Sequence, residues 1–300
     1  MVRRDEIHFR DPFLFPLPID RTYYLFGTTD PDPWKSKGTG FDVYTSGDLE
    51  NWEGPYPAFR PPTGFWAEKN FWAPEVHIYK DNFYMFASFY ADGRRRGTQI
   101  LQASCPIGPY LRHSQGPVTP GDWECLDGTF YLDENLTPWM IFSHEWVQAN
   151  DGEICAVQLS RDLRKAVGEA LVLFKASEAG WTKGIRRRDG SACEDARVTD
   201  GPFVYRMSDN TLLILWSSIS EGGYAMGYAR SRSGTLLGPW DQSEAPIIDC
   251  DGGHGMIFKS FEGRLYLCYH SPNTTPEERF HYTEIIEHEA GLARIRGKAH

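Results

Sequence analysis

The sequence has no continuous apolar stretch that approaches the eighteen or so residues needed to span a membrane. Its N-terminal residues, MVRRDEIHFRDPF, carry charges but no apolar signal-peptide core. We therefore expect no membrane partner and, for the chain as it stands, a cytoplasmic location. Removal of a signal peptide would leave the same sequence in a secreted protein, so secretion is the alternative.

Several catalytic motifs are also missing. The chain has no G-x-S-x-G elbow, no Walker loop and no H-E-x-x-H, so the esterase, NTPase and zinc-protease classes lack their central parts. Its formal charge of −10 argues against a nucleic-acid partner, because such binding depends on Lys and Arg. Two arginine triplets, residues 94–96 and 186–188, occur in loop-like sequence and are expected to be solvated loop tips. The six cysteines form no C-x-x-C pair, which favours reduced and buried thiols.

What the sequence does contain is a fivefold repeat. Each copy opens with a short polar-apolar motif and continues about a dozen residues later with an aromatic-rich strand, at a period of roughly fifty to seventy residues. The openings are RDPFLFP, WAPEVHIY, LDGTFYLD, TDGPFVY and GGHGMIF. The strands that follow them are YYLFGTT, FYMFAS, PWMIFSH, LLILWSS and LYLCYHS. This pattern predicts an all-β, five-bladed β-propeller in which residues 1–300 form one domain.

The opening motifs place ionisable residues at the starts of innermost strands, which converge on the propeller axis. These residues are Asp11, Glu75, Asp127, Asp200 and His254. Gathering four carboxylates and an imidazole at one axis costs solvation and adds repulsion between like charges, and a fold needs neither for stability. The convergence therefore predicts an active site.

Taken together, RDP, WAPEV, DGTFYLD, DGP and GGHG resemble the glycoside hydrolases of family 43 over nearly the whole chain. The resemblance implies a five-bladed propeller that hydrolyses glycosidic bonds with inversion and needs no redox or nucleotide cofactor. It also implies that Asp11 is the general base and that Asp127 orients the general acid and raises its pKa. An inverting glycosidase needs two such carboxyl groups, one to activate water and one to protonate the leaving oxygen.

The fourth repeat departs from this family. The family usually shows Glu-Gly-Pro, whereas this chain has Asp200-Gly201-Pro202, whose carboxyl group lies more than an ångström shorter in reach. A shift of about 1 Å can cost on the order of 10²-fold in rate. Three interpretations stay open: Asp200 is still the acid, Glu145 or Glu194 has replaced it, or the site binds sugar without cleaving it.

Aromatic side chains near the axis are candidates for contact with sugar rings, whose C–H faces are apolar. Trp72 is the first choice, and Trp146 follows the polar pair His144 and Glu145. Trp34, Trp66 and Trp181 are weaker candidates in loops. We also expect substrate contacts from Glu75, His144 and His254.

The resemblance implies that His254 helps to hold a structural calcium ion near the channel axis in some members. One imidazole is a weak signal, because calcium prefers about six to eight oxygen ligands. No metal or other cofactor is required by the expected chemistry.

We thus predict a glycoside hydrolase acting on oligosaccharides, with an exo-acting role on arabinofuranoside, xyloside or galactoside linkages. The alternative is a catalytically inactive carbohydrate-binding propeller. A glycoside phosphorylase lacks support, because no Arg and His cluster has an obvious phosphate-binding placement.

Overall fold

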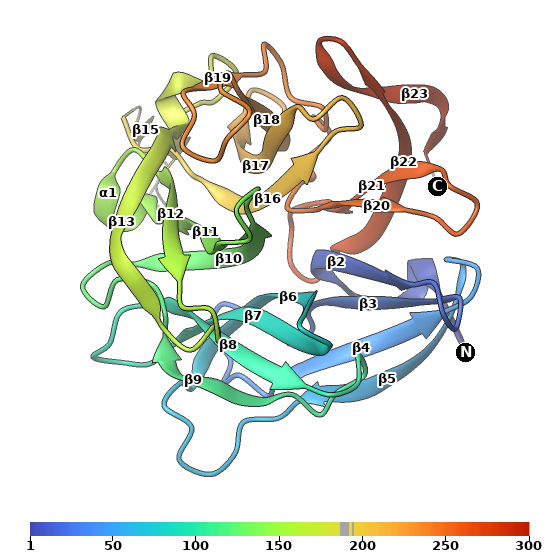
Figure 1. Cartoon of the computed structure of the whole chain (residues 1–300). Coiled ribbons are helices and arrows are strands. Elements are labelled where there is room, and N and C mark those ends of the chain that lie inside the picture. The colour runs from blue at the N-terminus through green and yellow to red at the C-terminus, as the bar shows by residue number, and fades with distance from the viewer. Residues whose placement is uncertain (187–191, 194, 300) are drawn as a thin grey trace.

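The protein forms five small antiparallel sheets arranged in a ring, which confirms the predicted five-bladed β-propeller (Figure 1). The structure is a computed structural model, and it describes residues 1–186, 192–193 and 195–299. Each blade is built from consecutive strands of the chain. The assignment of residues 1–300 to a single domain stays a prediction.

The strands follow the repeats of the sequence. Blade 1 contains β2 (Arg10–Leu17), β3 (Thr22–Thr28), β4 (Phe41–Ser46) and β5 (Asn51–Phe59), with β1 (Val2–Arg3) added at its outer edge. Blade 2 contains β6 (Lys69–Tyr79), β7 (Asn82–Tyr90), β8 (Gly97–Ala103) and β9 (Leu111–Pro117). Blade 3 contains β10 (Cys125–Leu132), β11 (Pro138–His144), β12 (Glu153–Leu159) and β13 (Ala166–Lys175). Blade 4 contains β16 (Asp200–Arg206), β17 (Leu212–Ser220), β18 (Gly223–Ser231) and β19 (Trp240–Gln242). Blade 5 contains β20 (Ile257–Lys259), β21 (Leu265–Ser271), β22 (Arg279–His288) and β23 (Gly291–Ala299).

Short elements lie between the blades. They are the 3-10 turns η1 (Arg4–Glu6) and η2 (Ala176–Glu178), the helix α1 (Trp146–Ala149), and the strand pair β14 (Ile185–Arg186) and β15 (Ala192–Cys193). Within the part of the chain that the structure describes, no helix is long and apolar enough to cross a membrane.

The core lies between neighbouring blades, whose apolar faces pack against one another. Phe86 of blade 2 and Phe142 of blade 3 belong to one buried cluster, and Leu215 of blade 4 shares another with Leu267 of blade 5. This packing fixes the innermost strand of each blade on both sides. The innermost strands therefore hold in place the side chains that project toward the axis.

The ring closes between the first and last blades without exchange of a strand. His8 forms a bridge with Arg279, and the backbone N–H of Phe9 donates to the carbonyl of Glu278 at 3.2 Å. The buried Glu278 carboxylate accepts from Arg10 Nη1 at 3.0 Å and lies 3.2 Å from His8 Nε2. We call the contacts of His8 and Arg10 with Glu278 the closing seam. Residues before Asp11 therefore add one edge strand to blade 1 and half of this seam.

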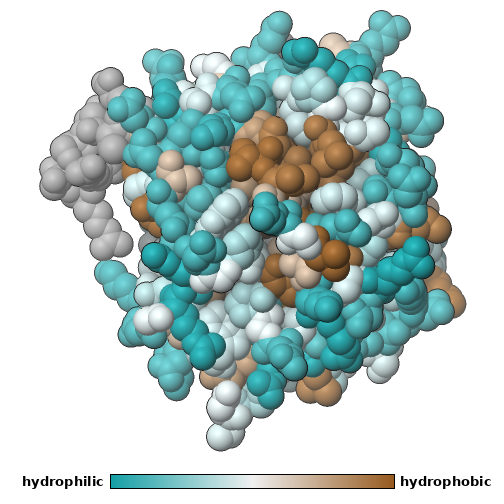
Figure 2. Space-filling view, turned by 60° about the vertical axis from the view of Figure 1, so that its left-hand side comes forward, coloured by the Kyte–Doolittle hydropathy of each residue, from teal (hydrophilic) through white to brown (hydrophobic). Residues whose placement is uncertain are grey.

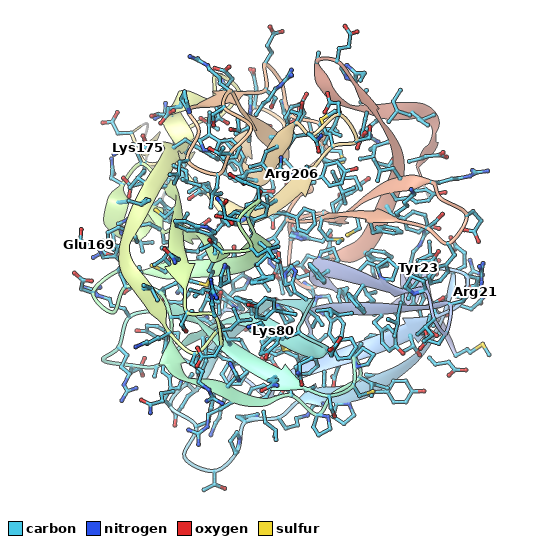
Figure 3. All side chains as sticks on the ribbon, viewed as in Figure 1. Arg21, Tyr23, Lys80, Glu169, Lys175 and Arg206 are labelled. Carbon is cyan, nitrogen blue, oxygen red and sulfur yellow. The ribbon has the colours of Figure 1, made fainter. Side chains whose placement is uncertain are left out.

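The outer surface combines charged and apolar side chains. Arg21, Glu169 and Lys175 point away from the blades (Figure 3). The edge strand β13 leaves Val167, Leu171 and Val172 exposed by 43–45%. Apolar side chains also gather on the face turned forward in Figure 2.

Five cysteines, Cys105, Cys125, Cys155, Cys250 and Cys268, are free, but they are not uniformly buried. Cys125, Cys155 and Cys268 lie inside the blades, as expected from their apolar strands. Cys105 and Cys250 are exposed, because they lie in connections between strands.

Candidate active site

Each innermost strand approaches the axis through a residue with left-handed backbone conformation. These residues are Asp11 (φ 54°), Ala73 (φ 46°), Asp127 (φ 58°), Gly201 (φ 50°) and His254 (φ 47°). Every one of them precedes a proline or a glycine, and the strand pairing shifts its register at this point in blades 1 to 4. The shift is a β-bulge, which re-aims the side chain at its position. The repeat thus carries a bulge that directs one residue per blade toward the axis.

Two of the five ionisable residues predicted from the repeat do not lie at the bulge position. Glu75 lies two positions beyond its blade's bulge residue, Ala73, and Asp200 lies one position before Gly201. The sequence pattern treated all five ionisable residues as equivalent, because a bulge cannot be seen from alternation alone. Only Asp11, Asp127 and His254 occupy equivalent positions.

A cavity of about 290 Å³ lies over these bulges. Eight of the predicted residues line it: Asp11, Trp34, Trp72, Asp127, Glu145, Trp146, Asp200 and His254. Glu75 and His144 do not. The volume is near the lower end of the ~300–1,000 Å³ typical of small-molecule sites.

Asp11 is held as a charged carboxylate. Its Oδ2 accepts a hydrogen bond from the Thr28 hydroxyl at 2.6 Å, and Arg10 Nε lies 3.6 Å from its Oδ1. Burial raises the pKa of Asp11, but the positive charges of His254 and Arg10, together with the Thr28 hydrogen bond, lower it below the ordinary value. Asp11 can therefore accept a proton at neutral pH.

His254 lies between two carboxylates. Its Nδ1 is 3.2 Å from Asp11 Oδ1 and 3.7 Å from Asp127 Oδ2, and its backbone N–H donates to Ser217 Oγ at 2.8 Å. Burial lowers the pKa of His254, but Asp11, Asp127 and Asp200 raise it, and the net direction is upward. A charged imidazolium at this point interacts favourably with both carboxyl groups and offsets one negative charge.

Gly201 makes room for His254. A Cβ atom at position 201 would lie 2.6 Å from His254 Cδ2, and the left-handed φ of 50° also disfavours a side chain there. The glycine that follows Asp200 is therefore required by both space and backbone conformation. Its N–H also donates to Asp127 Oδ2 at 3.0 Å, which joins blades 3 and 4 at the axis.

Asp127 and Asp200 have the opposite electrostatic character to Asp11. Burial and the charges of Asp200 and Asp11 raise the pKa of Asp127 to about 7, although His254 opposes this. Burial and the charge of Asp11 also raise the pKa of Asp200, against the effects of His254, Arg10 and a hydrogen bond from Tyr224. The two carboxyl groups interact, so they titrate as a pair rather than independently.

Tyr224 fixes the orientation of Asp200. Its hydroxyl donates to Asp200 Oδ2 at 3.2 Å, and its ring stacks on His270 with centroids 5.6 Å apart. His270 Nδ1 in turn accepts the Asp11 backbone N–H at 3.2 Å, which leaves its Nε2 to donate to Asn273 Oδ1 at 3.2 Å. Burial and Arg10 lower the pKa of His270 to about 3, so this imidazole is neutral.

Glu145 also lines the cavity but has a cationic partner. Its carboxylate is paired with Arg96, whose guanidinium lies 4.5 Å from the centre of the Trp72 ring. Burial raises the pKa of Glu145 to about 6, although Arg96 opposes the shift. Glu194, the other predicted substitute for the acid, lies outside the described residues.

Aromatic rings form one wall of the cavity. Trp34 and Trp72 meet edge to face with centroids 5.0 Å apart, and Trp72 Nε1 donates to the Pro33 carbonyl at 2.8 Å. The Arg10 guanidinium lies 4.9 Å from the centre of the Trp34 ring. Trp146, at the start of α1, lines the same space. Such flat faces suit the apolar side of a sugar ring.

Two residues predicted to contact substrate are directed elsewhere. His144 stacks on Trp123 at 4.3 Å, and its two ring nitrogens face Glu153 and Gln148. Glu75 is buried and pairs with His77 Nε2 at 3.1 Å. Both residues are therefore engaged with neighbouring side chains rather than with the cavity.

The donor set around His254 does not fit a calcium ion ligated chiefly by side chains. The Nδ1 of His254 already faces Asp11 and Asp127, and among the described residues no group of three or more His, Cys, Asp or Glu could hold a metal. Calcium takes about six to eight oxygen ligands. The calcium expectation stays a prediction, and no catalytic step is derived through a metal.

Sequence reasoning missed part of the cavity. Arg10, Tyr224 and Asn273 line it, yet none was singled out as a site residue. Arg10 could have been found, because it directly precedes Asp11 in the first opening motif. Tyr224 lies on the third strand of blade 4, where nothing in the sequence pattern points to the axis.

Comparison with known proteins agrees with this geometry. The sequence model for glycosyl hydrolases family 43 matches residues 8–290. The extracellular exo-α-(1→5)-L-arabinofuranosidase ArbA of Cellvibrio japonicus (strain Ueda107) is 28% identical over 267 residues, which cover 79% of this chain and 67% of the relative. The extracellular endo-α-(1→5)-L-arabinanase 1 of Bacillus subtilis (strain 168) is 22% identical over 247 residues, which cover 76% and 69%.

Among solved structures, an endo-arabinase from Bacteroides thetaiotaomicron VPI-5482 superposes with a TM-score of 0.88 and is 38% identical. The match covers 96% of this chain and 98% of that one. A thermostable family-43 glycoside hydrolase superposes with a TM-score of 0.82 at 22% identity, over 99% and 97% of the two chains, which supports the fold. This chain therefore belongs to glycosyl hydrolases family 43, as the five opening motifs indicated, and it is a glycosidase.

Proposed function

We propose that this protein hydrolyses α-L-arabinofuranosyl linkages of plant-type oligosaccharides with inversion at the anomeric carbon. The observation that carries the proposal is the opposite electrostatic character of the carboxyl groups in one cavity. The pKa of Asp11 is lowered, whereas those of Asp127 and Asp200 are raised. A charged base and a protonated acid facing one substrate are the two groups that an inverting glycosidase needs.

In the proposed reaction, Asp11 takes a proton from a water molecule, whose oxygen attacks the anomeric carbon. Asp200 gives its proton to the glycosidic oxygen as the bond from that oxygen to the anomeric carbon breaks. The incoming oxygen bonds to the opposite face of the sugar, so the anomeric configuration inverts. Asp127 is a positioning residue: its electrostatic interaction with Asp200 and its bond to Gly201 N–H keep Asp200 in place and protonated.

Asp200 is favoured over Glu145 as the acid because of its partners. Asp200 faces a neutral hydroxyl donor, Tyr224, whereas Glu145 is paired with the Arg96 cation. A permanent positive charge favours the ionised form of a carboxyl group. The shorter side chain of Asp200 then requires the leaving group to lie closer to its strand.

The relatives support an arabinose-containing substrate, because two are named as acting on α-(1→5)-L-arabinosyl bonds and a third as an endo-arabinase. Both exo and endo names occur among them. We propose exo action, since a cavity of about 290 Å³ is small for a site that encloses several sugars. The names of two relatives include the word extracellular, so the cytoplasmic expectation finds no support in them.

The test uses aryl glycosides of α-L-arabinofuranose, β-D-xylopyranose, β-D-galactofuranose and β-D-galactopyranose, together with linear arabino-oligosaccharides. We expect turnover of the arabinofuranoside, and proton NMR of the first product should show the inverted anomer. Products of a single short length would support exo action, whereas a ladder of lengths would indicate endo action. If every sugar binds and none is cleaved, the protein is the carbohydrate-binding propeller considered as the alternative.

A further inference from the structure

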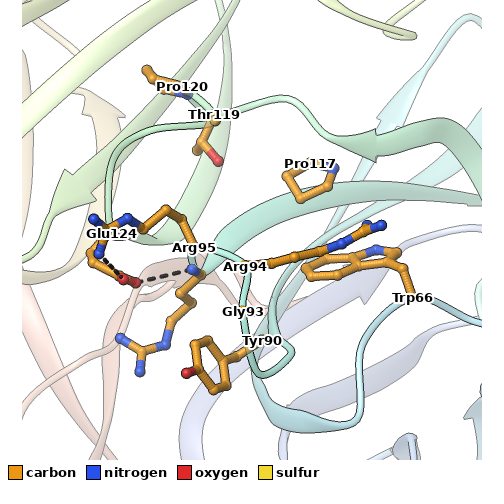
Figure 4. Close-up of a pocket in the computed structure, with 11 residues that line it drawn as sticks. Trp66, Tyr90, Gly93, Arg94, Arg95, Pro117, Thr119, Pro120 and Glu124 are labelled. Atoms are coloured by element: carbon orange, nitrogen blue, oxygen red, sulfur yellow. Dashed lines mark hydrogen bonds and ion pairs between the residues drawn. The ribbon is translucent and has the colours of Figure 1, made fainter.

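A second pocket lies beside the catalytic cavity and has a different chemistry. Its volume is about 640 Å³, and its walls come from the connections between β5 and β6, β7 and β8, and β9 and β10 (Figure 4). Arg94, Arg95 and Arg96 line it together with the aromatic rings of Trp66 and Tyr90. We call it the arginine pocket. Arg94 and Arg95 are exposed in the β7–β8 connection, as expected of a solvated loop, and the triplet also lines this concave surface.

The charges in this pocket do not cancel. Glu124 is the one carboxylate among its lining residues, and it binds Arg95 Nη1 at 2.9 Å and the backbone N–H of Arg96 at 3.0 Å. The Arg96 side chain is already paired with Glu145 of the catalytic cavity. Among the described side chains, no carboxylate pairs with Arg94. A guanidinium is therefore left to receive an anion, in a chain whose net charge is −10.

The Arg94 guanidinium also lies over the ring of Trp66. The distance from the guanidinium to the ring centre is 5.8 Å, and Figure 4 shows the two side chains lying along one another. The Trp66 ring is itself fixed, because its Nε1 donates to Gln99 Oε1 at 2.6 Å. An arginine placed on an aromatic face has an oriented fork of donors, which matches the two oxygens of a carboxylate.

Arg96 contacts residues of both the arginine pocket and the catalytic cavity. The Arg96 guanidinium lies 4.5 Å from the centre of the Trp72 ring, which lines the cavity, and 5.7 Å from that of Tyr90, which lines the pocket. A sugar chain bound at the catalytic carboxylates can therefore continue past Arg96 toward Arg94. An uncharged chain gains little from an unpaired guanidinium, whereas a chain that carries carboxylates gains a charge-assisted hydrogen bond.

We propose that the arginine pocket binds a uronic acid residue, so that the substrate class is an acidic oligosaccharide with a carboxylate near the cleaved linkage. The carboxylate binds Arg94, and the sugar ring lies against the Trp66 and Tyr90 side of the pocket. This inference rests on the proposed glycosidase function for its substrate, but the binding itself can be measured separately.

The experiment is calorimetric titration with methyl β-D-glucuronoside and the matched neutral ligand methyl β-D-glucoside, in a phosphate-free buffer of low ionic strength. We expect the glucuronoside to bind at least about tenfold more tightly, since hydrogen bonds between charged groups are the strong ones. Arg94→Gln should remove that difference, and Arg94→Lys, which keeps the charge but not the fork, should retain part of it. Arg161→Gln, an exposed arginine outside both cavities, is the control and should change nothing.

Two results would overturn the inference. The first is equal affinity for the two glycosides, or a difference that Arg94→Gln leaves intact. The second is displacement of the glucuronoside by inorganic phosphate at equal concentration with the same dependence on Arg94, which would make the pocket a site for free anions. Wild-type hydrolysis of aryl arabinofuranoside is measured in parallel. Glucuronoside binding without hydrolysis would reject the proposed function and retain the binding site, whereas hydrolysis without selective binding would reject only the inference.

Discussion

Asp11 and Asp200 face one cavity from blades 1 and 4, yet their surroundings move their pKa values in opposite directions. Both are buried, so burial does not distinguish them. Asp11 has Arg10 beside it and a short hydrogen bond from Thr28. Asp200 accepts a hydrogen bond from the neutral Tyr224 hydroxyl and interacts electrostatically with Asp127.

The comparison shows that two carboxyl groups of the same residue type have their pKa values moved in opposite directions by the partners that surround them. Arg10 and His254 lie next to Asp11, where blades 1 and 5 meet. Among the described side chains, no cation forms an ion pair with Asp200, although His254 and Arg10 lower its pKa from a greater distance. Each substitution below removes one carboxyl group or one of its hydrogen-bond partners.

Asp11→Asn should have the largest effect. The amide cannot accept the proton of water, so kcat should fall by about 10²–10⁴-fold on every substrate, whatever its leaving group. Steady-state kinetics on the aryl arabinofuranoside and on a linear oligosaccharide would measure this, with circular dichroism to confirm folding. Asp81→Asn, a change at an exposed turn, is the control. A variant that kept more than a tenth of the wild-type rate would show that Asp11 is not the base.

Asp200→Asn should have an effect that depends on the leaving group. A natural disaccharide needs a proton on its leaving oxygen, so its turnover should fall by about 10²-fold or more, whereas an activated aryl glycoside should lose about tenfold or less. The measurement is the ratio of kcat/KM for the two substrates in Asp200→Asn and in Glu145→Gln. If Glu145→Gln shows the leaving-group dependence and Asp200→Asn does not, the acid is Glu145.

Tyr224→Phe should have the smallest effect and should change the pH profile. The Tyr224 hydrogen bond lowers the pKa of Asp200, so its loss raises that pKa further. The acid must be protonated to act, and a higher pKa keeps it protonated to higher pH. The alkaline limb of kcat/KM should therefore move to higher pH, while the rate at the optimum falls by about tenfold or less. Tyr228→Phe, whose hydroxyl bonds the Ala290 carbonyl, is the control. A shift to lower pH would contradict the proposed contact.

Much of this site could be predicted because the repeat carries it. Asp11, Asp127 and His254 occupy one bulge position in three blades, so a spacing pattern was enough to bring them together. Asp200 was found through its motif, although it lies one residue before the bulge. Glu75 was misplaced by the same reasoning, since a bulge shifts the register by a residue without altering the alternation of apolar and polar positions.

Other features depend on contacts between segments far apart in the sequence. Tyr224 reaches Asp200 across a β-hairpin, and Asn273 lies in a connection of blade 5. His144 stacks on Trp123, which precedes β10, and faces Glu153 at the start of β12. These two contacts direct its ring away from the cavity. The role of Arg94 was missed because a pocket between three loops has no periodic signature.

Arg10 takes part in both the closing seam and the catalytic cavity. It binds Glu278 in the closing seam, and it lies beside Asp11 in the cavity. Separation of the first and last blades would therefore displace one of the cations that lower the pKa of Asp11, even while all five sheets stayed intact. Closure of the ring and the electrostatics of the proposed base thus depend on the same guanidinium.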